Sequence, residues 1–512
     1  MKANSLPIVL GASMLLVGLY FACLHLEQPA LYYDEILFVN AAVGGVTDTF
    51  IAKRVLGIPL FLMDYIGALK AWIHAPIFAL FGLDATTIRL PSIVIGAAGG
   101  LLLCMVAWRW FGATAFAVAA LLIFTQPAFI AHLRFDWGPT SLMFFFRGLL
   151  LWSCLRWVES AAPKWLWLTV LAMLLGTFDK LNFLWLDYAV LFALLLVYRS
   201  EMLTFYRSHR RQCWLAALVT ALVVLGNTRR AIRLSSEMPD HTLVLSARLE
   251  YVWLVIRPFV LGNSVANFVS QSAPAMPAFA LAASAAVVPL SLSAIYWLRD
   301  RTVQRIVVFL ALVAAGTFAA YFVTPSATGP HHLAILLGVP QLLVAALLSI
   351  GWARAGAVYR AAGGLLLGAI LIGHLMTDQA QMVSFARPQP NMDPANYQAA
   401  QFASRLPNAH ITLTDWGIGN QIVVASNGKT PFVEAAWAIR DAKSATEVLA
   451  HRERSRDNYY IGRLPGRGAI ADNWPRVIDA LQATGTAYTV VKDFPDYRGE
   501  PFIRILKIEA SP

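Results

Sequence analysis

Acidic side chains are scarce in this chain, which has 29 Asp and Glu residues against 40 Lys and Arg in 512 positions. Charged residues make up 13% of the sequence and hydrophobic residues 58%. Soluble globular proteins carry about 25% charged residues, so this composition excludes that class and predicts a polytopic membrane protein. The net charge of +11 then indicates basic cytoplasmic loops beside anionic membrane lipids, and nucleic acid is not expected as a partner.

Cysteine is also rare, with four residues in or beside apolar runs and no CxxC pair: Cys23, Cys104, Cys154 and Cys213. This pattern argues against a disulfide framework and against a thiolate metal site. No cofactor is predicted, and a divalent cation has no support in the sequence. No small-residue cleavage site clearly follows the first apolar run, which predicts an uncleaved signal anchor that is also the first span.

Long apolar runs are abundant, and a helix needs roughly 20 such residues to cross the hydrocarbon core. The sequence predicts about eleven spans, near 6–26, 91–108, 113–131, 140–157, 165–178, 183–198, 213–227, 276–297, 306–323, 333–350 and 361–376. The apolar segment 56–81 is interrupted by Pro and charged residues, and we expect interfacial or re-entrant helices there. Residues 228–274 are expected to form a long outer loop.

Arginine-rich turns fall on alternate sides of these spans, which predicts a cytoplasmic amino terminus and an outer carboxyl end. We therefore expect a multi-pass protein of the bacterial inner membrane. After residue 385, alternating apolar residues near 411–414, 487–491 and 502–506 predict strands, with helical patterns between them. The predicted domains are a membrane domain, 1–384, and a small periplasmic α/β domain, 385–512.

Two adjacent carboxylates, Asp34 and Glu35, follow the first span. An acid pair at the edge of a span, in a chain this poor in acids, indicates a candidate chemical centre. The alternative is a solvated loop end.

Other ionisable residues occupy short turns on the predicted outer side: Arg134, Asp136, Lys180, His331 and His332. Charges this close to hydrocarbon are costly unless they pair or face a cavity, so they predict a shared cleft. Such a cleft suits a lipid-linked phosphate substrate, with a carboxylate as general base and cations opposite the departing phosphate. The alternatives are an interfacial ion pair between Arg134 and Asp136, a Lys180 that extends to the headgroups, and interfacial histidines.

Four motifs resemble the GT-C superfamily of polyprenyl-phosphate-sugar glycosyltransferases, near the protein O-mannosyltransferases and lipid A aminoarabinose transferases. They are Tyr33-Asp34-Glu35; Thr87-Ile88-Arg89-Leu90-Pro91-Ser92 with Trp110-Phe111-Gly112; Phe178-Asp179-Lys180; and Gly329-Pro330-His331-His332-Leu333. Together they span about residues 1–376.

The resemblance implies a GT-C fold and inverting transfer of a sugar from a polyprenyl-phosphate donor, without a nucleotide sugar. It implies Asp34 as the catalytic acid/base residue, Glu35 as an acceptor-orienting neighbour and Asp136 as a candidate second acid. Lys180, and His331 or His332, are implied at the donor phosphate, with Arg134 matching less closely. The acceptor is an envelope lipid, glycan or protein.

Two other functions compete with this hypothesis. A transporter or flippase of a lipid-linked or anionic substrate predicts charges near the bilayer midplane and repeat symmetry between halves. The charges here gather at one face, and the sequence has no evident internal repeat. A non-catalytic envelope assembly protein predicts a dispensable acid pair.

Overall fold

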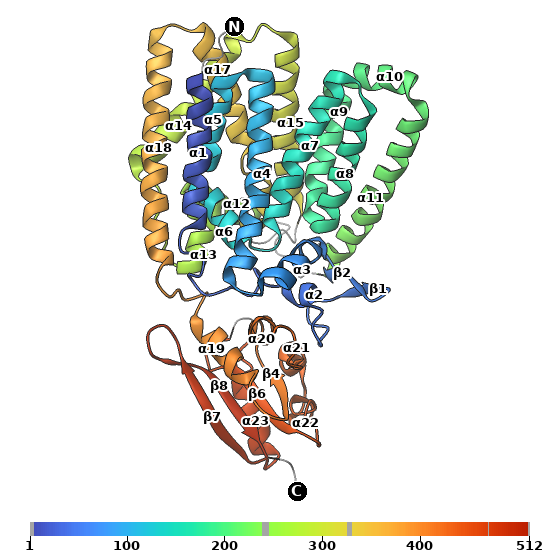
Figure 1. Cartoon of the computed structure of the whole chain (residues 1–512), viewed down its shortest axis with the longest axis vertical. Coiled ribbons are helices and arrows are strands. Elements are labelled where there is room, and N and C mark those ends of the chain that lie inside the picture. Colours follow the sequence, from blue (N-terminus) through green and yellow to red (C-terminus); the bar gives the residue numbers. More distant parts are fainter. Residues whose placement is uncertain (1–4, 238–244, 325–329, 469–470, 510–512) are drawn as a thin grey trace. The chain divides into compact units, whose positions relative to one another are not determined.

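The computed structural model describes residues 5–237, 245–324, 330–468 and 471–509 (Figure 1). Gly329 of the histidine motif lies outside these residues. The chain divides into two compact units. The first combines Met1–His25 with Arg89–Ser384, and the second combines Leu26–Ile88 with Phe385–Pro512. The division into 1–384 and 385–512 stays a prediction.

The first unit is helical and is called the membrane unit below. Its elements are α1 (Ser5–Cys23), α4 (Ala85–Phe111), α5 (Ala113–Phe124), α6 (Pro127–Phe135), α7 (Thr140–Ser160), α8 (Pro163–Asp179), η1 (Leu181–Phe183), α9 (Leu184–Val197), α10 (Arg199–Ser208), α11 (Arg210–Glu237), α12 (Leu245–Val260), α13 (Ser264–Ser270), α14 (Ala278–Ser293), η2 (Ala294–Trp297), α15 (Arg301–Val323), α16 (Pro330–Leu333), η3 (Ala334–Leu336), α17 (Val339–Arg354) and α18 (Ala357–Phe385).

Among the described residues, eight helices are long and apolar enough to cross a membrane, or up to eleven if each bent pair is one span. The bent pairs are α5 with α6, Leu181–Val197 with α10, and α12 with α13, at 62°, 89° and 95°. The prediction of a multi-pass helical membrane protein is confirmed. The predicted long loop at 228–274 is wrong, because α11 continues to Glu237 and α12 and α13 follow. Their interspersed arginines hid the helical pattern.

Glycines let α4 and α7 approach closely. A Cβ on Gly99 would lie 2.3 Å from the carbonyl oxygen of Phe144, and one on Gly148 would lie 2.5 Å from that of Gly99. Small residues permit such backbone contact, and dispersion and weak Cα–H···O interactions then hold the helices together. This contact fixes the start of α7, where the loop 136–139 enters the bundle.

The second unit, called the outer unit below, combines the first loop with the carboxyl-terminal segment. The first loop forms α2 (Val39–Val43), β1 (Lys53–Val55), β2 (Ile58–Met63), β3 (Ile66–Gly67) and α3 (Leu69–Phe81). Residues 53–67 are therefore a small antiparallel sheet, where we expected helices from residue 56 onward. The strands are short, and apolar runs of this length do not distinguish strand from helix by periodicity alone.

The carboxyl-terminal segment forms α19 (Pro394–Ala403), β4 (Ala409–Leu413), α20 (Ile418–Ser426), β5 (Val433–Glu434), α21 (Ala436–Asp441), α22 (Ala445–Val448), β6 (Asp457–Arg463), α23 (Trp474–Ala483), β7 (Tyr488–Pro495) and β8 (Pro501–Ile508). The sheet order is β5-β4-β6-β8-β7, with β4 parallel to β5 and β6 and the other pairs antiparallel. The predicted small α/β domain is confirmed.

Side chains alternate across this sheet, as a strand requires. Tyr460 and Leu506 point to one face, where they pack with α23 residues such as Val477. Ile461 and Ile505 point to the other face, where they join residues of α19, α20 and the first loop in one core. Segments far apart in the sequence thus share a hydrophobic core within the outer unit.

Candidate functional site

The Asp34–Glu35 loop is held by bonds inside the outer unit. Glu35 is buried, and its Oε2 accepts the backbone N–H of Tyr32 at 3.3 Å. Its backbone carbonyl oxygen accepts a hydrogen bond from Nζ of Lys70 at 3.4 Å. Asp34 is only half-buried. Glu35 therefore points into the loop, while Asp34 keeps access to the surroundings.

Three tyrosines surround Asp34. Burial raises the pKa of Tyr32 and Tyr33, and the Asp34 carboxylate raises each further. Burial and then Asp34 also raise the pKa of Tyr65 to about 12. The three phenols stay neutral at physiological pH, and their hydroxyl groups can donate hydrogen bonds. The carboxylate thus lies among neutral aromatic groups, an environment in which a general base can be tuned.

Lys70 is the residue that sequence reasoning missed in this loop. It lies in α3, is 4% exposed, and its Nζ is 4.1 Å from the centre of the Phe38 ring. Nδ1 of His74, one turn later, lies 2.9 Å from the carbonyl oxygen of Lys70. A cation inside an apolar segment was the available signal, because such residues are costly unless they serve a site.

Asp136 follows α6 and precedes the start of α7 in the membrane unit. It has a left-handed backbone with φ of 40°, and its Oδ1 accepts Ser141 N at 2.7 Å and Thr140 Oγ1 at 3.0 Å. These bonds satisfy orphan groups at the start of the helix, as an N-terminal capping carboxylate does. Arg134, two residues earlier, is buried, and its guanidinium donates to the carbonyls of Ala22, Leu24 and His25, at the end of α1 and just after it.

Lys180 and the histidine turn meet the same loop. Nζ of Lys180, which is 2% exposed, donates to the carbonyl of Gly138 at 2.7 Å. The ring of His331 lies 4.8 Å from that of Trp137 and 4.2 Å from that of His332. Nδ1 of His331 is buried and has no hydrogen-bond partner in the part of the chain that the structure describes. The residues predicted in the membrane unit therefore gather around residues 136–139.

Arg147 supports this group and was not singled out from the sequence. It is fully buried on α7, and Nη1 donates to the carbonyls of Ile335 at 3.0 Å and Ala334 at 3.4 Å. It thereby anchors the segment that follows the two histidines. Arg147 is a single charge within an apolar helix, and the sequence holds no pattern that would identify its partners, which are backbone carbonyls far along the chain.

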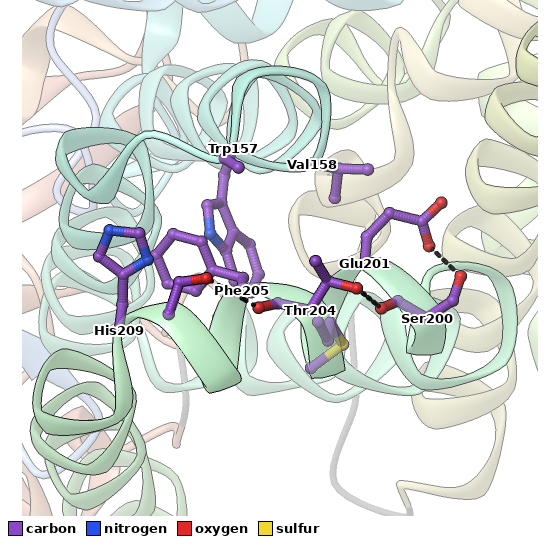
Figure 2. Close-up of a pocket in the computed structure, with 10 residues that line it drawn as sticks. Trp157, Val158, Ser200, Glu201, Thr204, Phe205 and His209 are labelled. Carbon is purple, nitrogen blue, oxygen red and sulfur yellow. Dashed lines mark hydrogen bonds between the residues drawn. The ribbon is translucent and has the colours of Figure 1, made fainter.

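A separate cavity of about 280 Å³ lies between the end of α7 and α10. Trp157 and Phe205 form its apolar side, and Ser200 and Thr204 line the polar side (Figure 2). Thr204 Oγ1 donates to the Ser200 carbonyl at 2.9 Å. None of the residues predicted to act on substrate lines this cavity, so we do not assign the reaction to it.

No group of three or more His, Cys, Asp or Glu side chains suited to a metal ion occurs within residues 5–237, 245–324, 330–468 and 471–509.

The helical bundle, large first loop and carboxyl-terminal sheet place the chain in the GT-C fold class of membrane proteins. Within that class, residues 68–228 match the family described as dolichyl-phosphate-mannose-protein mannosyltransferase. No match was found among curated proteins.

Two solved structures share the fold over nearly the whole chain. ArnT from Cupriavidus metallidurans in the apo state is 15% identical, with a TM-score of 0.62, over 98% of this chain and 97% of that one. The same protein bound to undecaprenyl phosphate is 15% identical, with a TM-score of 0.60, over 99% of each chain.

Proposed function

We propose that this protein transfers a sugar from a polyprenyl-phosphate donor to an acceptor hydroxyl on the periplasmic face of the inner membrane, with inversion at the anomeric carbon. The observation that carries the proposal is Asp34, a half-buried carboxylate among three half-buried tyrosines, beside the buried Glu35. The ArnT structure bound to undecaprenyl phosphate supports a polyprenyl-phosphate donor for this fold.

In the proposed step, Asp34 accepts the proton of the acceptor hydroxyl as its oxygen bonds to the anomeric carbon. The bond from that carbon to the phosphate oxygen breaks, and its electron pair leaves with the polyprenyl phosphate. A cation stabilises the charge that develops on the departing oxygen. After the step, Asp34 is protonated and neutral, and the released polyprenyl phosphate carries one more negative charge than the phosphate of the donor did.

The donor phosphate is assigned to the group around residues 136–139. Lys180 supplies the positive charge, and His331 and His332 supply ring nitrogens that hydrogen-bond phosphate oxygens. Arg134 holds the end of α1 in position through three backbone carbonyls. Asp136 supplies a second carboxylate to this group, and Glu35 fixes the loop that carries Asp34.

The test is transfer of radiolabelled sugar from a panel of polyprenyl-phosphate sugars to membrane extracts, with purified wild type and Asp34→Asn. We expect Asp34→Asn to lower the rate by about 10²–10⁴-fold, the usual contribution of a general base. The matched control is Asp48→Asn, an exposed acid of the same loop that pairs with Arg54, which should retain the wild-type rate. A folded Asp34→Asn protein with full activity would refute the proposal and favour a transporter of the same lipid.

A further inference from the structure

Two amide side chains of α20 hold the loop that carries Asp34. Asn420 Nδ2 donates to the carbonyl of Tyr33 at 3.0 Å, and Gln421 Nε2 donates to the carbonyl of Leu31 at 2.6 Å. Both amides are nearly fully buried, at 1% and 3% exposure. Buried polar groups rarely go unpaired, so these two bonds restrict where the backbone of residues 31–33 can lie.

The turn before α20, at Trp416 and Gly417, packs against Tyr33 of the same loop. Gly417 has φ of +87°, and a Cβ there would lie 3.0 Å from Cγ and Cδ1 of Tyr33. The ring of Trp416 meets the ring of Tyr33 edge-on at 6.1 Å, and the two side chains share a hydrogen bond. Contacts therefore hold both the backbone and the ring of Tyr33, the residue that precedes Asp34.

This turn is itself anchored to β6. Arg463 Nη1 lies 3.0 Å from Asp415 Oδ2 and donates to the Trp416 carbonyl at 2.9 Å. Its Nη2 donates to Asn396 Oδ1 at 2.8 Å. A planar guanidinium that contacts three groups in this way, one of them a carboxylate, restricts the orientation of the turn as well as its position. A continuous set of bonds thus runs from the sheet, through the turn and α20, to the loop.

We propose that Asn420 and Gln421 are positioning residues for the reaction, and that the carboxyl-terminal domain orients Asp34. This inference rests on the proposed function, in which Asp34 is the base. Rate depends steeply on geometry, and an error near 1 Å at a reacting group costs about 10²-fold. Rigid elements hold such groups better than loops do, which explains why a loop carboxylate would be tied to a helix.

The experiment uses the full-length protein with Asn420→Leu and Gln421→Met, made singly and together. Each replacement is close in size and removes the donor, together with an amide oxygen that has no partner among the described residues. Each replacement leaves a backbone carbonyl of the loop without its donor, so some stability is lost, and the variants are assayed at a temperature at which they remain folded. We expect kcat to fall about 10- to 100-fold with little change in KM for the donor. Hydrogen exchange of residues 31–37 should rise.

Asn458→Leu is the matched control. Asn458 is also a buried amide in the outer unit, and its Nδ2 donates to the carbonyls of Glu453 at 2.8 Å and Arg456 at 3.1 Å. Its partners lie away from the first loop in sequence, so its loss should lower stability and leave kcat and exchange of residues 31–37 unchanged.

The same substitutions are repeated in Asp34→Asn. If Asn420 and Gln421 act through Asp34, they add no further loss there, because residues that act as a unit are not additive. Full kcat in the folded double variant, or an equal loss in the Asp34→Asn background, would overturn the inference. In either case an inactive Asp34→Asn would leave the proposed function standing, whereas an active one would reject that function itself.

Discussion

The carboxyl group of Glu434 lies where burial disfavours its ionised form. It lies at the end of β5, and its Oε1 is buried without a partner among the described residues. Burial, and then the charge of Asp415, raise its pKa to about 7, although the Gly417 N–H opposes the shift. Since an ordinary glutamate has a pKa near 4.3, the folded state disfavours the ionised form.

We therefore expect the outer unit to lose stability as pH rises. The contribution of neutral Glu434 is complete below pH 4.5 and is lost through about pH 7. Glu434→Gln cannot ionise, so its thermal midpoint should exceed that of wild type at pH 8 by about 2–4 °C, and by much less at pH 5. Fluorescence-monitored unfolding at both values measures this difference. Asp479→Asn, on the exposed face of α23, is the control, and an equal shift at both pH values would contradict the prediction.

At the scale of elements, Asp136 has two separable roles beside the start of α7: it caps the helix, and it carries a charge. Its Oδ1 accepts both capping bonds, and its carboxylate also places a negative charge in the group around residues 136–139, to which the donor phosphate is assigned. Asparagine retains an Oδ1 acceptor and tolerates the left-handed backbone, but carries no charge. Alanine has neither property.

Asp136→Asn should unfold at the wild-type temperature and lose at least about tenfold in transfer rate. Asp136→Ala should in addition lose about 1 kcal/mol or more of stability, because the cap is gone. Thermal unfolding and the transfer assay on both variants distinguish these effects. Wild-type transfer by Asp136→Asn would restrict the residue to helix capping.

The membrane helices were largely predictable from sequence because a bilayer sets a minimum length for an apolar helix. The strands at 53–67 and the helices at 245–270 were not, since short runs and scattered arginines blur periodicity. The site shows the same division. Asp34, Lys180 and the histidines stood out as charges beside spans, but Asn420 and Gln421 did not. Their importance depends on contacts with residues almost 400 positions away, which no local pattern contains.

At the scale of the whole molecule, the first loop and the carboxyl-terminal segment depend on one core. Ile36 and Val39 from the loop pack in the same cluster as Ile418 and Ile422 of α20. Neither segment can bury these side chains alone, so we expect the loop to lose its fold when the last 128 residues, 385–512, are removed.

Limited trypsin digestion tests this dependence. In the full-length protein, cleavage should occur after the exposed Lys53 and Arg54 but not after Lys70, which is 4% exposed. In a chain ending at residue 384, cleavage after Lys70 should become fast, and cleavage after Lys53 should change little. Continued protection of Lys70 in the shortened chain would show that the loop folds independently.

The shared core also sets an order of events during biosynthesis. Residue 88 is synthesised about 300 residues before residue 385, which at typical elongation rates is a delay of roughly 15–60 s. During that interval the loop that carries Asp34 lacks the carboxyl-terminal segment with which it forms its hydrophobic core. A polypeptide that stops before residue 385 would therefore be inserted in the bilayer with its first loop unfolded, and that loop could complete its fold only after the segment from residue 385 onward has been made.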